Sequence, residues 1–210
     1  MASFWDHSWG TLSTQRILEY IADYDLDPDD FIHQLHIRKA ETICDAGCGC
    51  GIYSLKLAAN GFSVSGFDIS AKAVAIASDL LQQAGFHARL QQASILATPY
   101  PDGCFDCVLS RDVLDHMPRV QAKAAIRELL RITAPGGLVC VGVDHSDEEY
   151  EAEPHFLNAD NDYIFTQGKW NGMVFHNYTP QELAELVPEN TAYTIENTPH
   201  GLTLQITKSA

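Results

Sequence analysis

Hydrophobic residues along the middle of the chain follow two alternating patterns. Short apolar runs bounded by turn-forming residues predict buried strands near residues 41–45, 62–68, 87–93, 105–110 and 138–143. Between these runs, apolar positions at helical spacing predict helices near residues 51–60, 70–84 and 118–133. Strands that alternate with helices in this way favour a parallel sheet covered by helices on both faces.

The C-terminal end of the chain predicts a helix followed by a hairpin. The run Thr179-Pro180-Gln181-Glu182 is a capping box with proline at the first helical position, and it predicts a short helix through about Val187. Residues 192–196 and 202–208 then predict two antiparallel strands around a turn. The predicted fold class is therefore α/β, with a seven-stranded, mostly parallel sheet that ends in an antiparallel hairpin.

Two further segments complete the predicted organisation. Apolar residues between positions 11 and 24 predict an amphipathic helix, so that residues 1–40 form an N-terminal helical cap. Residues 144–178 are acidic and aromatic and too long for an ordinary connection, which predicts a lid or a substrate wall. With a core at 41–143 and a C-terminal part at 179–210, we expect a single domain of 210 residues.

The turn after the first predicted strand has glycine at every second position. Asp45 ends the strand, and Gly47, Gly49 and Gly51 follow before a predicted helix. Glycine lets the backbone approach a ligand closely because no Cβ stands in the way, and a helix N-terminus favours anionic groups. A dinucleotide fingerprint would place the third glycine one residue later. The turn therefore predicts a nucleotide-like ligand, but not a nicotinamide dinucleotide.

Asp68 ends the second predicted strand. It lies 23 residues after Asp45, about where an α/β nucleotide fold places a carboxylate that accepts hydrogen bonds from ribose hydroxyls. The alternative is that Asp68 caps the helix that begins near Ser70. The glycine turn favours the ribose role.

Five segments follow one another in an order that is typical of one family. They are Asp45–Gly51, Phe67–Ile69, Pro101–Ser110, Val113–Met117 and Leu130–Gly137. Together they resemble the class I S-adenosylmethionine-dependent methyltransferases, especially the small-molecule group that includes ubiquinone- and menaquinone-pathway enzymes. The resemblance covers about half of the chain. It implies a Rossmann-like methyltransferase fold, S-adenosyl-L-methionine as cofactor, and methyl transfer to an oxygen or nitrogen of a small molecule.

The resemblance also assigns cofactor-binding residues by position. They are Asp45, Gly47, Gly49, Gly51, Asp68, Ile69, Ser94, Ile95, Ser110 and Arg111. In this assignment the glycine backbone passes beneath the methionine moiety, and Asp45 lies near its ammonium group. Asp68 holds the ribose, Ile69 lies against adenine, and Ser110 and Arg111 present backbone near the sulfonium.

Ser94 departs from the family pattern, because the family usually has an acid at this position. A serine hydroxyl is a neutral acceptor, so we expect it to bind the adenine amino group more weakly than a carboxylate would. This departure, together with the lack of an unambiguous general base, motivates an alternative from another class of function. In that alternative the chain is a catalytically silent methyltransferase-like binding subunit.

A general base is needed only if the methyl acceptor must lose a proton. Three histidines near the expected site, His116, His145 and His176, are the catalytic candidates, with Asp112 and Asp115 as carboxylate alternatives. His145 directly follows the fifth strand, near the expected substrate. His116 and His176 also have structural interpretations, and the sequence leaves the choice of base open.

The aromatic N-terminal segment from Phe4 to Trp9 allows two interpretations. In the family, such segments often close over the cofactor, where aromatic faces attract a sulfonium and exclude water. Alternatively, Trp5 and Trp9 anchor the first helix to the sheet. The sequence favours neither.

Charge restricts the partners of the chain. Its 28 acidic residues exceed its 13 basic residues, for a net charge of −15, and no cluster of basic residues could neutralise phosphates. We therefore expect a small-molecule substrate and no nucleic acid. The acidic segment from Asp144 to Glu153 is either a solvated loop or an electrostatic attractant for a cationic or amine substrate.

The remaining composition predicts a cytosolic protein, as a monomer or homodimer, without a metal. No apolar run approaches the roughly 18 residues of a membrane span, and no secretory signal is present, so we expect no membrane partner. The six cysteines include no two pairs at the spacing of a zinc module. Cys48 and Cys50 precede a helix N-terminus, which predicts lowered thiol pKa values and sensitivity to alkylation.

Overall fold

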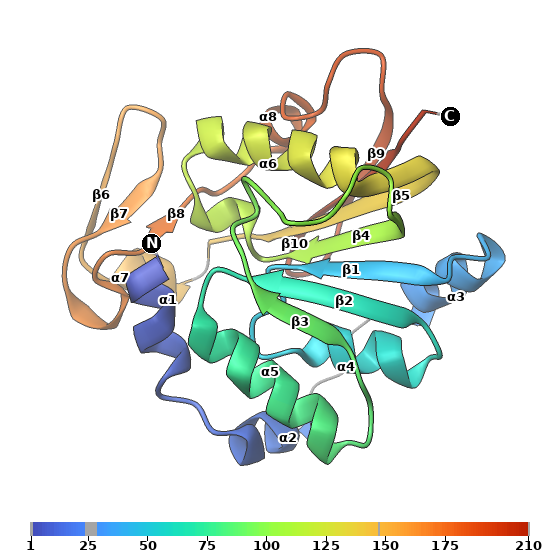
Figure 1. The fold of residues 1–210 in the computed structure, drawn as a ribbon. Coiled ribbons are helices and arrows are strands. Elements are labelled where there is room, and N and C mark those ends of the chain that lie inside the picture. Colours follow the sequence, from blue (N-terminus) through green and yellow to red (C-terminus); the bar gives the residue numbers. More distant parts are fainter. Residues whose placement is uncertain (1, 24–28, 147, 210) are drawn as a thin grey trace.

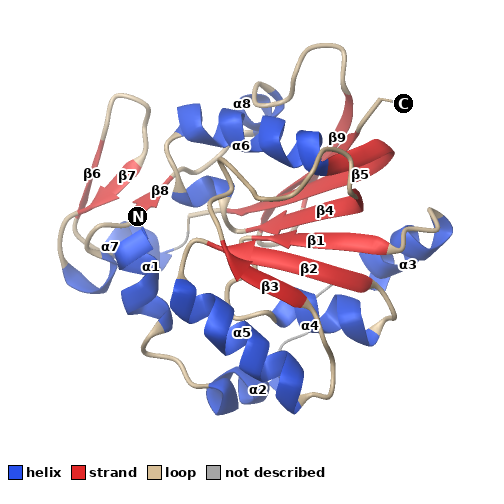
Figure 2. Ribbon diagram, in the orientation of Figure 1, coloured by secondary structure: helices blue, strands red, loops and turns tan. Residues whose placement is uncertain are grey.

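A seven-stranded sheet runs through the middle of the molecule (Figures 1 and 2). The computed structural model describes residues 2–23, 29–146 and 148–209. The strand order is β3-β2-β1-β4-β5-β10-β9. The strands are β1 (Thr42–Ala46), β2 (Ser63–Asp68), β3 (Arg89–Gln92), β4 (Phe105–Arg111), β5 (Thr133–Asp144), β9 (Ala192–Asn197) and β10 (Gly201–Thr207). Strands β1 to β5 pair in parallel, and β10 pairs antiparallel with both β5 and β9. The predicted sheet and its terminal hairpin are confirmed.

Helices cover both faces of this sheet. They are α4 (Ile52–Ala59), α5 (Ala71–Gln83), α6 (Arg119–Ile132) and α8 (Pro180–Ala184). The first three lie within one residue of their predicted bounds. The last begins with the predicted capping box, both halves of which are present, but it ends before Val187. A short 3-10 helix, η1 (Leu114–His116), follows β4.

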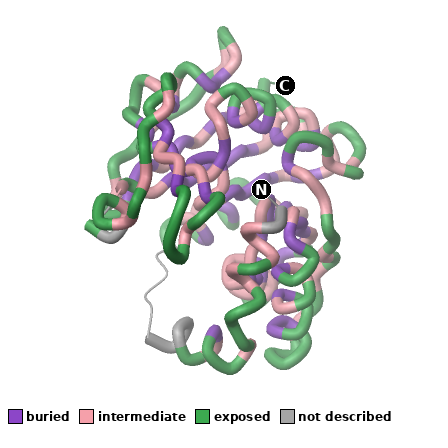
Figure 3. Tube along the Cα trace, turned by 90° about the vertical axis from the view of Figure 1, so that its left-hand side faces the viewer, coloured by how far each residue is buried: buried purple, intermediate pink, exposed green. Residues whose placement is uncertain are grey.

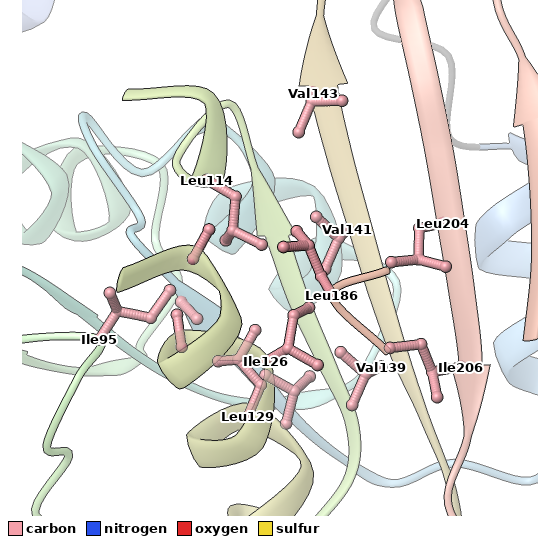
Figure 4. Packing of buried hydrophobic residues seen from close by; sticks show 14 of the residues in the cluster. Ile95, Leu114, Ile126, Leu129, Val139, Val141, Val143, Leu186, Leu204 and Ile206 are labelled. Atoms are coloured by element: carbon pink, nitrogen blue, oxygen red, sulfur yellow. The ribbon is translucent and has the colours of Figure 1, made fainter. Parts of the chain in front are cut away.

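The sheet separates two cores because neighbouring residues of a strand point to opposite faces. On one face, Ile126 and Leu129 of α6 pack against Val139 and Val141 of β5 (Figure 4). On the other face, Leu57 of α4 packs in a second cluster with residues of β1, β2, β4 and β5. Buried segments gather along the sheet, and exposed segments lie on the outer helices and loops (Figure 3). Each face therefore holds the helices through apolar burial.

The start of β5 differs from the prediction. The strand begins at Thr133, which pairs with Phe105, and the register shifts between Phe105 and Cys107. The predicted strand began at residue 138, because Pro135 and two glycines read as a turn. An irregular pairing accommodates these residues at the sheet margin.

The described residues of the N-terminal part form three helices, whereas one was predicted, between positions 11 and 24. They are α1 (Ala2–Trp9), α2 (Thr14–Asp23) and α3 (Asp29–Ile37). The predicted C-terminal end of the middle helix, at Tyr24, lies outside the described residues. Ile17 of α2 packs on Leu80 of α5, whereas α3 buries Leu35 against the sheet. Residues 1–40 were expected to form a helical cap, and the described part of them is mainly helical.

The segment predicted as a lid contains its own small sheet. It comprises α7 (Glu148–Ala152), β6 (His155–Leu157), β7 (Tyr163–Phe165), the 3-10 helix η2 (Gly168–Trp170) and β8 (Val174–Phe175). The three strands pair antiparallel in the order β6-β7-β8. Figure 1 shows this small sheet beside helix α1, beyond the end of the large sheet. Among the described residues, no helix combines the length and the apolar character needed to cross a bilayer.

Candidate functional site

A cleft of about 1530 Å³ lies at the carboxyl ends of the parallel strands. Its walls come from the glycine turn, the ends of β2, β4 and β5, helices α1, α2 and α3, the residues around α7 and η2, and β10. In open α/β sheets this edge is where ligands bind. A pocket for one small molecule usually measures about 300–1,000 Å³. The cleft therefore has room for two ligands side by side.

The glycine turn forms one side of this cleft. Gly47 and Gly49 have positive φ angles of 80° and 50°, a region that favours glycine. A Cβ on Gly47 would overlap the side chain of Val113, and one on Gly49 would lie 3.0 Å from the ring of Trp9. Side chains are excluded here, so the backbone itself faces the cleft.

The Asp68 carboxylate is held beside this turn. Its Oδ2 accepts a hydrogen bond from the Gly49 N–H at 3.0 Å, and its Oδ1 accepts one from the Ser70 N–H at 2.8 Å. The cap of α5 is Ser70, whose hydroxyl accepts from the Ala73 N–H, so the alternative role of Asp68 as that cap is wrong. Burial raises the pKa of Asp68 in spite of these bonds.

Three assigned residues lie behind the cleft surface rather than on it. Asp45 is buried, and its Oδ2 accepts a hydrogen bond from the Ser54 hydroxyl at 2.6 Å. Burial raises the pKa of Asp45 to about 6. Gly51 precedes α4 in a left-handed conformation, and Ser110 is fully buried within β4. These three residues are absent from the cleft lining.

The assigned adenine-side residues do line the cleft. Ile69 follows β2, and Ser94 and Ile95 follow β3. The Ser94 hydroxyl accepts a hydrogen bond from the Leu96 N–H at 3.2 Å, which closes a tight turn. Ile95 is largely buried in the core that lies under α6. The Ala93 N–H donates a 3.0 Å hydrogen bond to the Asp68 carbonyl oxygen, which holds the start of this turn against the end of β2.

Helix α1 lines the cleft and is anchored to helix α5 rather than to the large sheet, and its closure over a cofactor stays a prediction. The Asp6 carboxylate accepts a hydrogen bond from the Ser70 hydroxyl at 2.6 Å, which ties α1 to the start of α5. Trp9 covers Gly49, and Trp5 lies edge-on to His116 with ring centroids 4.9 Å apart. The segment therefore anchors the first helix and also forms a wall of the cleft.

Charged residues gather at the ends of β4 and β5. Arg111 lines the cleft with its guanidinium 5.8 Å from the centroid of the Tyr53 ring. A Cβ on Gly142, its partner in β5, would lie 2.5 Å from the Arg111 Cζ, so this glycine makes room for the guanidinium. The Arg111 Nη1 also donates a 3.4 Å hydrogen bond to the Thr203 hydroxyl.

Three carboxylates surround this guanidinium region. Burial and the charges of Asp144 and Asp115 raise the pKa of Asp112 to about 7. Burial raises the pKa of Asp115 to about 7, although its Oδ2 accepts a hydrogen bond from the Asp144 N–H at 3.1 Å. Burial also raises the pKa of Asp144. Asp112 and Asp144 line the cleft, and Asp115 lies fully buried behind them.

The three candidate histidines have different positions. His116 and His145 line the cleft, whereas His176 is not among the lining residues. The His116 Nδ1 lies 3.3 Å from the Val174 carbonyl oxygen, and burial lowers the pKa of the ring. His176 is buried with its Nδ1 2.8 Å from the Asp162 carboxylate.

The two cysteines of the glycine turn contradict their predicted reactivity. Cys48 and Cys50 are each only 7% exposed. Burial raises the pKa of both thiols, that of Cys50 to about 11. The helix N-terminus does not offset the loss of solvation, so the prediction of lowered thiol pKa values is wrong. The described residues include no group of side chains that could hold a metal ion.

Sequence reasoning did not single out several residues that residues 144–178, strand β10 and helix α4 bring to the cleft. Tyr150, Trp170 and Thr203 line it, as does Tyr53 of α4. Their positions depend on how distant segments pack, and no local pattern marks them. Aromatic enrichment in residues 144–178 was the only available signal.

Known proteins resemble this chain in sequence. A family model described as a methyltransferase domain matches residues 43–137. The 27-O-demethylrifamycin SV methyltransferase of Amycolatopsis mediterranei (strain S699) is 31% identical over 171 residues, which cover 79% of this chain and 57% of the relative. The ubiquinone biosynthesis O-methyltransferase of Nitrosomonas europaea is 35% identical over 101 residues, which cover 47% of this chain and 42% of the relative. The chain thus spans about two fifths to three fifths of the length of these curated relatives.

Solved structures share the fold. The PH0226 protein from Pyrococcus horikoshii OT3 superposes with a TM-score of 0.71 at 15% identity, covering 91% of this chain and 99% of that chain. The magnesium protoporphyrin IX methyltransferase from Synechocystis PCC 6803, solved with bound S-adenosylhomocysteine, gives a TM-score of 0.63 at 20% identity, covering 86% and 81%. These superpositions show that the chain shares its overall fold with both proteins.

Proposed function

We propose that the chain, whose residues 43–137 match a methyltransferase-domain model, is a class I S-adenosylmethionine-dependent methyltransferase that transfers a methyl group from S-adenosyl-L-methionine to an oxygen or nitrogen of a small-molecule acceptor. One observation carries the proposal. The glycine turn and the Asp68 carboxylate lie together in a cleft that has room for both a cofactor and an acceptor.

The residues present fit this cofactor. Each Asp68 oxygen accepts one backbone hydrogen bond, and a carboxylate oxygen has a second lone pair, so two acceptor positions remain for ribose hydroxyls. The backbone at Gly47 and Gly49 would pass beneath the methionine moiety, because no Cβ can occupy that space. Ile69 and Ser94 would flank the adenine.

Of the other assigned residues, Ile95 and Arg111 line the cleft, whereas Asp45, Gly51 and Ser110 would act from behind its surface. Asp45, at the end of β1, would contribute negative charge toward the ammonium group of the methionine moiety. Gly51 would set the start of α4, and Ile95 would support the adenine from the core. Ser110 and Arg111 would supply backbone at the end of β4. Burial and position support these roles.

A small-molecule acceptor is supported by charge and by the relatives. The chain carries a net charge of −15, which opposes binding to a polyanion. The curated relatives are named as methyltransferases of a rifamycin, of quinone biosynthesis and of ajmaline. We also propose that the protein is cytosolic, because all six cysteines are free, as is typical of a reducing compartment. We further propose that it is a monomer or a homodimer.

The chain contributes positioning and exclusion of water. When bound, S-adenosylmethionine supplies an electrophilic methyl group. Trp5, Trp9 and Trp170 cover the cleft and exclude water from the reacting groups. Two ligands held side by side in this space would be positioned for transfer, and a proton acceptor is needed only where the acceptor must lose a proton.

Among the histidines, His116 fits the role of proton acceptor best. If the proton on Nδ1 donates to the Val174 carbonyl oxygen, Nε2 is left as the acceptor. The lowered pKa keeps the ring neutral near pH 7, as a base must be. His145 is a second candidate at the mouth of the cleft. For His176 we propose a structural role, since its Nδ1 lies against Asp162.

Calorimetric titration with S-adenosylmethionine, S-adenosylhomocysteine and NADH tests the proposal. We expect both sulfur compounds to bind and NADH not to bind. Asp68→Ala removes the acceptors of the ribose hydroxyls. It should weaken the binding of both sulfur compounds by at least about 1 kcal/mol, which is about fivefold in affinity. Asp160→Ala, at an exposed position outside the cleft, is the matched control and should bind as the wild type does. Folded protein that binds neither sulfur compound would refute the proposal.

A further inference from the structure

The part of the cleft near the ends of β4 and β5 carries more negative than positive charge. Among the described residues that line the cleft, the acidic ones apart from Asp68 are Asp30, Asp112, Asp144 and Glu196, and the basic ones are Arg16 and Arg111. The fully buried Asp115 adds a further carboxylate directly behind this surface. The potential in this part of the cleft therefore favours a cation over an anion.

Arg111 does not neutralise these carboxylates by direct pairing. Among the described residues, its guanidinium contacts the Tyr53 ring and the Thr203 hydroxyl and forms no ion pair with a carboxylate. Two carboxylate oxygens, Asp112 Oδ1 and Asp115 Oδ1, are buried and have no hydrogen-bond partner in the described part of the chain. Buried polar atoms of this kind are normally satisfied. Because Asp112 lines the cleft, its unpartnered oxygen indicates a donor-bearing ligand, whereas Asp115 lies behind the cleft surface.

Backbone geometry holds one of these carboxylates in place. Asp112 has a positive φ of 56°, a conformation in which aspartate and asparagine are enriched. Its N–H donates a hydrogen bond to the Gly142 carbonyl oxygen at 3.0 Å. Asp144 is fixed in a similar way, because its N–H donates to the buried Asp115. The two carboxylates are thus preorganised rather than carried on loose loops.

The burial of like charges supports the same conclusion. Burial, and after it the repulsion between neighbouring ionised carboxylates, raises the pKa values of Asp112 and Asp115, and the positive charge of Arg111 offsets this only in part. A cation placed between them would relieve both the repulsion and the loss of solvation. An anion would add to the repulsion, and a neutral hydroxyl would change it little.

Aromatic rings face the same space. The cleft is lined by Trp5, Tyr53, Tyr150 and Trp170. The ring centroids of Tyr150 and Trp170 lie 4.4 Å apart. The faces of tryptophan and tyrosine attract ammonium groups, and they also bind flat apolar groups. Carboxylates combined with aromatic rings are the chemistry that recognises an organic cation.

We propose that the methyl acceptor is an amine that binds as a cation, with its ammonium group held by Asp112 and Asp144 beside the aromatic rings. This inference rests on the proposed function and specifies its substrate class. His116 accepts one ammonium proton, and the freed nitrogen lone pair forms the new bond to the methyl carbon. The electron pair of the broken carbon–sulfur bond stays on sulfur. The product leaves as a methylated ammonium, and His116 returns its proton to water.

Binding of three matched probes tests the inference. 2-Phenylethylamine, 2-phenylethanol and phenylacetate share a ring and a short chain, but are cationic, neutral and anionic at pH 7.5. Calorimetry in the presence of saturating S-adenosylhomocysteine should give at least tenfold tighter binding for the amine than for the alcohol, and the weakest binding for phenylacetate. The amine's affinity should fall with added salt.

Two variants locate the binding site. Asp112→Asn and Asp144→Asn should each lower the affinity for the amine at least tenfold and leave the affinity for the alcohol unchanged. Asparagine tolerates the positive φ at position 112, so that variant preserves the backbone. Asp160→Asn is the matched control at an exposed position outside the cleft, and it should not change the affinity of any probe.

The outcomes separate the two proposals. Equal binding of amine and alcohol, or tighter binding of phenylacetate through Arg111, would overturn the inference and leave the proposed function intact, provided that S-adenosylhomocysteine still binds. Tight amine binding that neither Asp112→Asn nor Asp144→Asn weakens would also overturn it. If S-adenosylhomocysteine does not bind the wild type, the proposed function fails and this inference fails with it.

Discussion

Replacing Asp115 by asparagine should make the protein less sensitive to alkaline pH. Asp115 is fully buried, and its Oδ2 accepts a hydrogen bond from the Asp144 N–H. An asparagine carbonyl oxygen can accept the same bond, so the substitution removes the ionisable group and keeps the local geometry. The effect on stability therefore depends on the charge, and the charge depends on pH.

The magnitude follows from the displaced pKa. Burial raises the pKa of Asp115 from 3.8 to about 7 in the folded state. Because the folded-state pKa is the higher one, this group's contribution to stability is fully present below about pH 4 and is lost as the pH rises through about 7. The shift is roughly three pKa units at about 1.4 kcal/mol each, so ionisation costs the wild type at most about 4 kcal/mol above pH 8. Asparagine does not bear this cost.

Urea unfolding of the wild type and Asp115→Asn at pH 5 and pH 8.5 measures the effect. The free energy of unfolding of the variant, relative to the wild type, should increase between the two pH values by about 1–4 kcal/mol. Any cost of packing the asparagine amide is the same at both pH values and cancels in this difference. A difference that stays constant within about 0.5 kcal/mol would refute the assignment of a costly buried carboxylate.

Asp106→Asn is the matched control, with the opposite sign. Burial of Asp106 is outweighed by hydrogen bonds from the N–H groups of Glu41 and Thr42 and from the Thr42 hydroxyl, so its pKa is lowered. A lowered carboxylate pKa stabilises the fold above the unfolded pKa and loses that contribution in acid. Asp106→Asn should therefore destabilise the protein at both pH 5 and pH 8.5.

Three further predictions concern packing, capping and thiol chemistry. Gly142→Ala should displace the Arg111 guanidinium, since the new Cβ would lie 2.5 Å from its Cζ, and should cost about 1–3 kcal/mol in urea unfolding; unchanged stability would mean that the guanidinium moves freely. Thr179→Ala removes the side-chain half of a capping box and should cost about 1 kcal/mol, whereas Thr179→Ser should cost much less. Cys48 and Cys50 should resist iodoacetamide at pH 8 until the protein is unfolded, as followed by mass spectrometry; rapid labelling of the native protein would contradict their burial.

Patterns within a short stretch of chain determined most of the fold. The apolar run of β1 and the helical spacing of α5 each specify their element through neighbours only a few residues away. The capping box at Thr179 is a contact across three residues, so its start was predictable to the residue. The glycine turn also belongs to this group, because a backbone that must approach a ligand requires the residue without a Cβ.

The tertiary structure alone decided which side chains share the cleft. The three strands of the small sheet have two or three residues each, too few for a hydrophobic period to be visible. His176 precedes a predicted helix, but its partner is Asp162, and only the folding of the small sheet brings the two together. Arg111 and Gly142 are paired by the register of β4 against β5. The sequence by itself therefore determined the large sheet and most of the helices that cover it, the glycine turn and the family resemblance. The small sheet, the carboxylates near Arg111, the aromatic walls and the position of each histidine depend on contacts between segments far apart in the chain.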